Sequence, residues 1–196
     1  MDIVRLKLKG AAPLLMHSDR GANPLDPDTA RFTQYRKVKS SGRTDEWLAN
    51  VLKMEFMLGL YHDSGLGPYL PTANLRKALE EGAALSKLKS SVRRAVICDG
   101  DRAPLAYAGP RDKEGLWADR RFRDIRTIKN GNSRVPRCRA VFKEWSLSVA
   151  FHFDPSMIDR EKVIFCLQSA GAYIGVGDYR PVCGGQFGRF TVEEEP

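Results

Sequence analysis

A glycine-rich segment near the end of the printed sequence carries the residue types of a phosphate-binding loop. It is GVGDYRPVCGGQFGRFTV, Gly175 to Val192, and it precedes a predicted final strand. Glycine permits positive φ and close approach of another backbone, so we expect a sharply bent loop with exposed amides around Gly184 and Gly185. Those amides would bind phosphate oxygens, while Arg180 adds charge and Tyr179 a stacking surface. A tight connection into an edge strand is the alternative interpretation.

An arginine-rich segment earlier in the chain indicates a second chemistry. The sequence WADRRFRDIRTIKNGNSRVPRCRAVFK interleaves basic residues with Trp117, Phe122 and Phe142. Single-stranded nucleic acid is bound by this combination, with guanidinium groups on phosphates and rings on bases. Arginine dominates over lysine, and its planar fork suits phosphate oxygens. A solvated, flexible loop is the alternative. The predicted nucleic-acid-binding residues here are Arg120, Arg121, Arg123, Arg126, Lys129, Arg134, Arg137 and Arg139.

The loop after the first predicted strand has the residue types for binding or for catalysis. His17 and Arg20 are predicted phosphate contacts, and His17, Asp19 and Asp26 are candidates for a general base or metal ligand. Aspartates beside prolines are ordinarily turn residues, so we expect binding without turnover, and neither a metal nor a cofactor. Three basic residues in the ambiguous stretch Thr29 to Arg43 complete the predicted binding set: Arg36, Lys37 and Arg43.

The composition is that of one globular domain. The chain has 196 residues, of which 42% are hydrophobic and 29% charged, enough to bury a sizeable core. A net charge of +8 favours a polyanionic partner, because neutralised phosphates release their counterions. We expect a cytoplasmic protein with reduced thiols, since no apolar run could span a bilayer and the N-terminal residues alternate like a strand. The four cysteines are scattered singly: Cys98, Cys138, Cys166 and Cys183.

Hydrophobic spacing predicts the elements that would position these segments. The predicted strands are Asp2 to Lys9, Val92 to Cys98, Val141 to Phe153 and Phe187 to Val192. The predicted helices are Glu46 to about Tyr61, Thr72 to about Ser90 and Asp159 to about Ser169. Between them, residues 99–143 form a predicted basic arm that stands away from the core. The order indicates an α+β, ferredoxin-like or RRM-like single domain, with helices on one face of an antiparallel sheet.

Three segments, in the correct order, resemble the RAMP superfamily of CRISPR effector proteins. LKGAAPLLMHSDRG is similar to its first strand and following loop, and GPYLPTANLRKALEE to the segment that enters its first helix. AGAYIGVGDYRPVCGGQFGRF resembles its C-terminal glycine-rich loop, in which an Ile-Gly pair and an arginine precede a Gly-x-Gly-Arg type turn. Thr72, Ala73 and Asn74 replace the glycine and serines that the family carries in the second segment, and Lys77-Ala78 stands for its lysine-glycine pair.

The resemblance is greatest to the backbone subunit of the Cas seven family, which polymerises along guide RNA. It implies a single-stranded RNA-binding subunit, with residues 99–143 as a thumb that touches the next copy, and with other effector subunits as partners. A head-to-tail contact of this kind propagates into a filament. In some members an aspartate of the first loop cuts target RNA, so an endoribonuclease is one alternative. A stand-alone mobile-element relative that coats nucleic acid is another.

Overall fold

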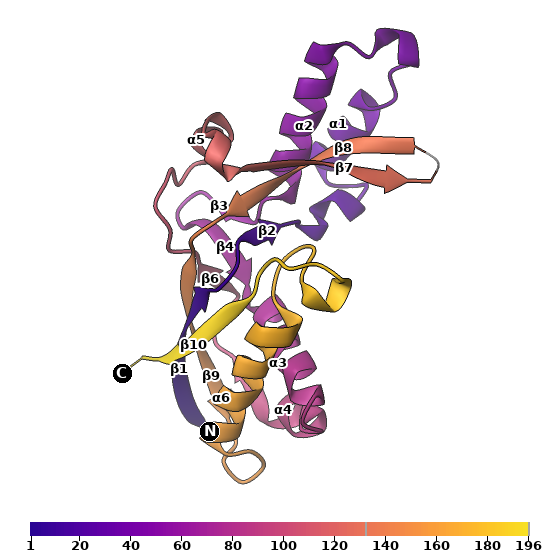
Figure 1. Ribbon diagram of the computed structural model, residues 1–196. Helices are drawn as coiled ribbons and strands as arrows, with labels where there is room; N and C mark the ends of the chain where they lie inside the picture. The colour runs from indigo at the N-terminus through magenta and orange to yellow at the C-terminus, as the bar shows by residue number, and fades with distance from the viewer. Residues whose placement is uncertain (132, 196) are drawn as a thin grey trace.

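An antiparallel sheet of four strands forms the lower half of the molecule (Figure 1). The computed structural model describes residues 1–131 and 133–195. The strand order is β10-β1-β9-β5, and every neighbouring pair is antiparallel. Its members are β1 (Asp2–Gly10), β5 (Val96–Cys98), β9 (Ser146–Phe153) and β10 (Phe190–Glu194). Alternate residues of the two central strands are buried, as the period of two predicts, including Leu6, Leu8 and Phe151.

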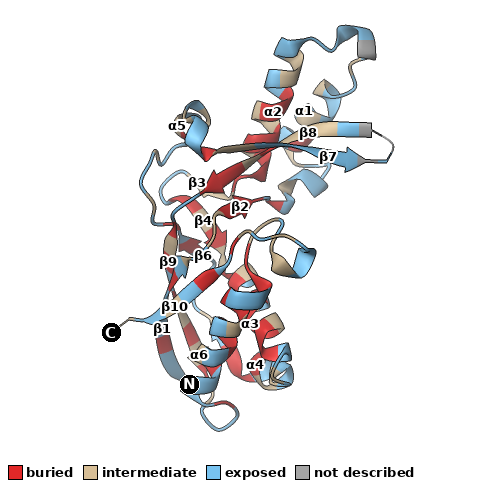
Figure 2. Cartoon of the chain, in the orientation of Figure 1, coloured by how far each residue is buried: buried red, intermediate tan, exposed pale blue. Residues whose placement is uncertain are grey.

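Helices cover one face of this sheet, and the buried residues lie between the two layers (Figure 2). They are α3 (Thr72–Ala84), α4 (Lys89–Ala95) and α6 (Arg160–Ser169), and α6 continues as a π-helical turn, Ala170–Ile174. Gly82 of α3 permits close packing on α6, because a Cβ at this position would overlap the carbonyl oxygen of Cys166. The core follows the order β1, α3, β5, β9, α6, β10, which confirms the predicted α+β class.

The upper half of Figure 1 contains two smaller sheets and three helices. One sheet has the order β2-β8-β7, formed by β2 (Leu14–Met16), β7 (Arg123–Asn130) and β8 (Ser133–Phe142). The other has the order β3-β4-β6, formed by β3 (His62–Asp63), β4 (Gly67–Pro71) and β6 (Arg102–Pro104). The helices are α1 (Pro27–Tyr35), α2 (Asp45–Gly59) and α5 (Lys113–Ala118). Short 3₁₀ turns lie at Asp19–Ala22, Ser40–Gly42, Arg120–Phe122 and Pro181–Cys183.

The segment 99–143 does not stand away from the core as a whole, which corrects the prediction. Leu105, Leu116 and Phe122 are buried in the main hydrophobic cluster, and β6 pairs with β4. The rings of Tyr107 and Phe142 meet edge to face at 4.8 Å between centroids. The part that projects is the hairpin β7–β8, which extends beside α2 in Figure 1. The rest of the segment packs on the core through short apolar stretches that lie between its glycines and prolines.

Two predicted elements are interrupted. The strand expected from Val141 to Phe153 breaks between β8 and β9, where Trp145 is buried and its Nε1 donates to the carbonyl oxygen of Ala12 at 2.9 Å. The helix expected to reach Ser90 ends at Ala84, and the chain turns through Lys87 at a positive φ of 61°. Val92 therefore belongs to α4 and not to the following strand. Burial of the Trp145 ring interrupts the predicted strand, and the left-handed backbone at Lys87 ends the predicted helix.

Candidate nucleic-acid interface

The hairpin and the glycine-rich loop, the two segments predicted to bind nucleic acid, are in direct contact. The guanidinium of Arg126 on β7 lies over the ring of Phe187, 4.6 Å from its centroid. Arg139 on β8 forms an ion pair with Asp178 of the loop. The loop also packs on β2, because the N–H of Asp178 donates to the carbonyl oxygen of Leu15 at 2.7 Å. The fold thus brings together hairpin and loop residues that lie 61 positions apart for Arg126 and Phe187 and 39 for Arg139 and Asp178.

Two adjoining hollows lie between the hairpin and the loop, and we call them together the arm groove. Their volumes are about 830 and 490 Å³, and they share Asp124, Arg126 and Tyr179. The basic residues that line them come from the 3₁₀ turn before β7, from both hairpin strands and from the link to β9. The arm groove is lined by Arg120, Arg121, Arg123, Arg126, Lys129, Arg137, Arg139, Lys143, Asp178, Tyr179, Gly184, Gly185 and Phe187, among others.

Some cations of the arm groove are free of carboxylates. Among the residues that the structure describes, Arg120, Arg123, Lys129 and Lys143 have no ion pair. Arg123 is held in place by the ring of Trp117, whose centroid lies 4.6 Å from its guanidinium carbon. An aromatic face orients a guanidinium without neutralising it. These side chains therefore keep their full charge for an anionic ligand.

Two other arginines of the groove are paired with carboxylates of their own segment. Arg121 contacts Asp119 at 2.6 Å, and Arg126 contacts Asp124 at 2.6 Å. Hydrogen bonds from Arg121 hold the pKa of the Asp119 carboxyl below its usual range, so this carboxylate stays ionised. The hydrogen bond to Asp124 correspondingly raises the pKa of Arg126. Each pair contributes little net charge to the groove.

Arg137 and Arg139 are committed to the interior edge of the hairpin. Arg137 Nη1 donates to Glu55 Oε1 of α2 at 2.8 Å, and Glu55 Oε2 accepts the backbone N–H of Cys138 at 2.9 Å. Arg137 and Arg139 retain only 22% and 17% of their side-chain exposure. Their contacts fix the hairpin on α2 and on the glycine-rich loop, which is a different role from the phosphate contact that the sequence predicted.

The glycine-rich loop does not offer the exposed amides that we expected at Gly184 and Gly185. The N–H of Gly184 donates to Pro181, that of Gly185 to Arg180, and that of Gly188 to Pro13. A Cβ at Gly185 would overlap the carbonyl oxygen of Tyr179, so glycine is needed for close backbone approach. The loop instead presents rings at the groove, and Tyr179 is 52% exposed at a φ of 50°.

A further hollow lies behind the loop, and we call it the loop pocket. It is lined by His17, Tyr61, Asn74, Lys77, Glu81, the backbone of residues 175–178 and Arg180, and it shares Asp178 with the arm groove. The pKa of His17 is lowered by burial and, secondarily, by Arg139, although its side chain stays half exposed. Its Nδ1 lies 4.0 Å from Asp178 Oδ2. Asn74, Lys77 and Glu81 were not predicted as site residues, although their spacing places them on one helical face.

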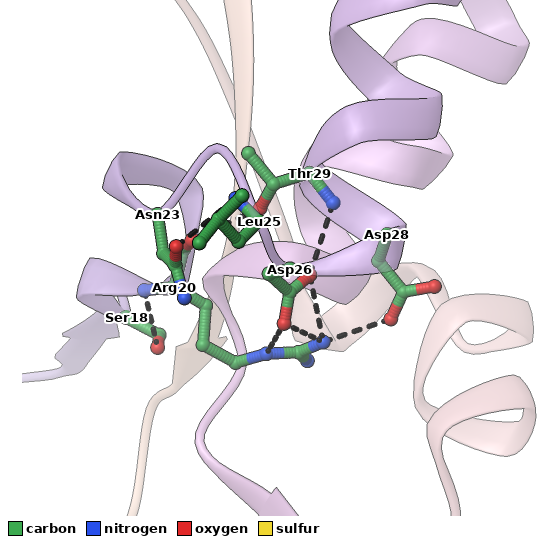
Figure 3. A network of polar contacts seen from close by, with 7 residues as sticks. All are labelled: Ser18, Arg20, Asn23, Leu25, Asp26, Asp28 and Thr29. Atoms are coloured by element: carbon green, nitrogen blue, oxygen red, sulfur yellow. Dashed lines mark hydrogen bonds and ion pairs between the residues drawn. The ribbon is translucent and has the colours of Figure 1, made fainter.

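Arg20 and Asp26 serve local structure (Figure 3). Arg20 Nη2 contacts Asp26 Oδ2 at 3.1 Å and Asp28 Oδ2 at 2.8 Å, and its side chain points toward both carboxylates. Asp26 caps α1 by accepting the N–H of Thr29 at 3.0 Å, which lowers the pKa of its carboxyl. Both Oδ atoms of Asp26 are thus engaged, while Asp19 begins an exposed 3₁₀ turn. Within residues 1–131 and 133–195, no group of three His, Cys, Asp or Glu is placed to hold a metal.

The remaining predicted residues lie away from the groove. Arg36 stacks over Phe32 at 5.3 Å, and Arg43 stacks over Trp47 at 5.4 Å, so both lie near the connection between α1 and α2. Lys37 is exposed in the same connection. Arg134 is exposed opposite Lys129 near the tip of the hairpin. The structure does not bring these four residues together with the glycine-rich loop.

No family model matches the sequence, and no curated protein matches it. One similar solved structure is a chain of the Type III-B Cmr-beta bound to cognate target RNA, with a TM-score of 0.48 and 13% identity over 99% of this chain. Another is Cmr6 from Pyrococcus furiosus, with a TM-score of 0.39 and 10% identity, covering 97% of each chain. This chain covers 58% of the length of the first. No described helix is long and apolar enough to cross a membrane.

Proposed function

We propose that the chain binds single-stranded RNA along the arm groove, as a subunit of a CRISPR-type RNA-guided effector. The observation that carries the proposal is the contact of the hairpin with the glycine-rich loop around unpaired cations and the rings of Tyr179 and Phe187. Arg120, Arg123 and Lys143 would neutralise phosphates, and Tyr179 and Phe187 would stack on bases. Cations and ring faces recognise every nucleotide alike, so a guide bound here would leave its sequence to be read by pairing.

The domain and assembly follow from the same proposal. We assign the βαββαβ core to the ferredoxin-like class and the hairpin β7–β8 to the thumb-like arm. The hairpin projects from the core and exposes Ile125 and Ile128, which are 52% and 40% accessible. A projecting arm with two exposed isoleucines fits a surface of the next copy, so RNA-bound chains would form a head-to-tail filament in the cytoplasm. Sedimentation of the protein with a 40-nucleotide RNA should give a larger species than with a 10-nucleotide RNA.

The test of binding replaces two unpaired cations of the groove. The double variant Arg120→Gln/Lys143→Gln should reduce the dependence of log affinity on log salt by about 1.4, because each phosphate contact in a single strand contributes about 0.7. If the two titrations meet at 1 M salt, this difference makes the variant about tenfold weaker at 0.15 M. Fluorescence anisotropy of a labelled 20-nucleotide RNA, between 50 and 500 mM salt, measures both quantities.

A matched control removes two positive charges from a surface away from the arm groove. Lys89 and Arg94 are exposed on α4, on the helical side of the large sheet and far from the hairpin in Figure 1. The variant Arg94→Gln/Lys89→Gln has the same net charge as the groove variant, +6 instead of +8 after the loss of two cations. Its salt dependence should match that of the unaltered chain. Equal loss in both variants would show that total charge, rather than the arm groove, binds the RNA.

We propose binding without turnover. The carboxylate oxygens of Asp26 accept hydrogen bonds from the Arg20 guanidinium and from the backbone N–H of Thr29 in α1. These contacts support a structural role for that carboxylate. Incubation of the protein with end-labelled RNA, with and without magnesium, tests this part of the proposal. RNA should remain intact in both mixtures. Cleavage that His17→Ala or Asp19→Ala abolishes would support the endoribonuclease instead.

A further inference from the structure

The loop pocket differs from the arm groove because it combines acceptors with cations. One wall is the face of α3 that carries Asn74, Lys77 and Glu81, and the opposite wall is the backbone of residues 175–178. His17, Tyr61 and Arg180 complete the lining of a space of about 320 Å³. Asp178 lines both this pocket and the arm groove, so the two hollows adjoin at this residue.

Glu81 lines this pocket with a side chain that keeps 24% of its exposure, and one of its two carboxylate oxygens has no hydrogen-bond partner among the described residues. Its Oε2 is the one buried side-chain nitrogen or oxygen without a hydrogen-bond partner in the described part of the chain. The other oxygen, Oε1, lies 3.7 Å from Lys77 Nζ of the preceding turn. Buried acceptors nearly always have a donor, and leaving a charged one without a partner is costly. The geometry therefore calls for a ligand that supplies an N–H or O–H group.

The cations of the pocket call for an anionic part of the same ligand. Lys77 keeps 58% of its side-chain exposure, and Arg180 uses Nη1 to donate to the carbonyl oxygen of Gly177 at 3.1 Å. The structure gives Arg180 no carboxylate partner among the residues it describes. Tyr61 lies half-buried at the wall and offers a ring face. A donor-bearing base attached to a phosphate satisfies all three kinds of group.

We propose that the loop pocket takes one base of the bound strand and selects a base with an exocyclic amino group over uracil. The proposal rests on RNA binding in the arm groove. The amino group of cytosine, adenine or guanine would donate to the partly exposed carboxylate of Glu81, with the flanking phosphate near Lys77 and Arg180. Uracil has a single N–H donor between two carbonyl oxygens, and these oxygens repel a carboxylate. The chain would thus prefer amino-bearing bases at one position of its footprint.

Cytosine and uracil form the sharpest test pair, because they differ at C4 by an amino group in place of an oxygen. The affinities to compare are those for a 12-nucleotide oligouridine and for the same oligomer with one interior cytosine. The unaltered chain should bind the cytosine oligomer about tenfold more tightly, the value of one hydrogen bond to a charged acceptor. In Glu81→Met, which keeps the length of the side chain and removes both acceptors, the ratio should fall to about one.

The two proposals fail in different ways. Equal affinity of the unaltered chain for both oligomers would overturn base selection and leave RNA binding intact. A tenfold preference that survives in Glu81→Met would also overturn it, because another group would then read the amino group. Failure of both oligomers to bind would overturn the proposed function and the pocket with it. Thermal unfolding of Glu81→Met should show no loss of stability, since the substitution removes an unsatisfied buried oxygen.

Discussion

Four arginines of the hairpin region form two groups with opposite surroundings. Arg120 and Arg123 face the arm groove without a carboxylate among the described residues, and a ring orients one of them. Arg137 and Arg139 lie two residues apart on β8 and turn toward Glu55 of α2 and Asp178 of the loop. The same residue type therefore does two jobs, because one group supplies charge and the other holds the surface that displays it.

The difference shows that arginine density does not measure the charge available to a ligand. A guanidinium that is paired with a buried carboxylate gains little by binding a phosphate, because breaking the pair would leave the carboxylate buried without a partner. The paired group is instead expected to control stability, and the unpaired group to control affinity. Substitutions that change stability without changing RNA affinity, or the reverse, test whether the two groups have these separate roles.

The largest effect is expected at the pair between Arg137 and Glu55. Arg137→Leu leaves Glu55 buried with only the N–H of Cys138 as a donor. The free energy of unfolding should fall by about 3 kcal/mol, the typical cost of an uncompensated buried charge. Urea denaturation followed by circular dichroism measures the change. By contrast, Arg120→Gln at the exposed side of the same region should stay within about 0.5 kcal/mol.

A second variant distinguishes lost charge pairing from lost packing. Glu55→Gln/Arg137→Leu removes both charges and keeps an amide oxygen that can accept the N–H of Cys138. Most of the lost stability should return, because replacing both partners of a buried pair is far less costly than removing one. A double variant as unstable as Arg137→Leu would assign the effect to packing of the arginine stem.

The sequence predicted the framework well where burial follows a simple period. Alternation along Asp2 to Lys9 and along the second half of Val141 to Phe153 located β1 and β9, and the observed helix α2 begins one residue before the predicted start. The contact between the hairpin and the loop agrees with the hypothesis that both segments bind one strand. That hypothesis came from residue types, since both segments combine arginines with rings.

What the sequence left open depends on distant partners. Glu55 and Arg137 are separated by 82 positions, so spacing gave no sign that this arginine is neutralised. The amides of Asp178 and Gly188 donate to Leu15 and Pro13, far away in the chain, whereas those of Gly184 and Gly185, the predicted phosphate cradle, are satisfied inside the loop by Pro181 and Arg180. Asn74, Lys77 and Glu81 share a helical face, but only the packing of α3 on α6 through Gly82 turns that face toward the loop.

A smaller effect is expected from the ring of Phe187 in the glycine-rich loop. Phe187 lies under the paired Arg126 and lines the same groove as the unpaired cations. Phe187→Leu should weaken RNA binding about tenfold through lost stacking, while the salt dependence stays unchanged because no charge is removed. Phe165→Leu, at a 52% exposed position of α6, is the matched control and should leave binding unaltered. A changed salt slope in Phe187→Leu would indicate that Arg126 had moved with the ring.

The smallest effect is expected from His17, which lies beside the ion pair of Arg139 and Asp178. Burial and Arg139 lower the pKa of His17 in the folded chain below the ordinary 6.5, so the unfolded chain binds the proton more readily. The free energy of unfolding should therefore decrease as the pH falls through 6.5 toward the lowered pKa. A phosphate in the loop pocket would favour the charged imidazole and raise its pKa, so RNA affinity should instead increase over the same range. His17→Gln should remove both trends, whereas His152→Gln, on the large sheet, should keep them. If RNA affinity of the unaltered chain shows no change between pH 7.5 and 6, the strand does not approach His17, and the path from the arm groove into the loop pocket is wrong.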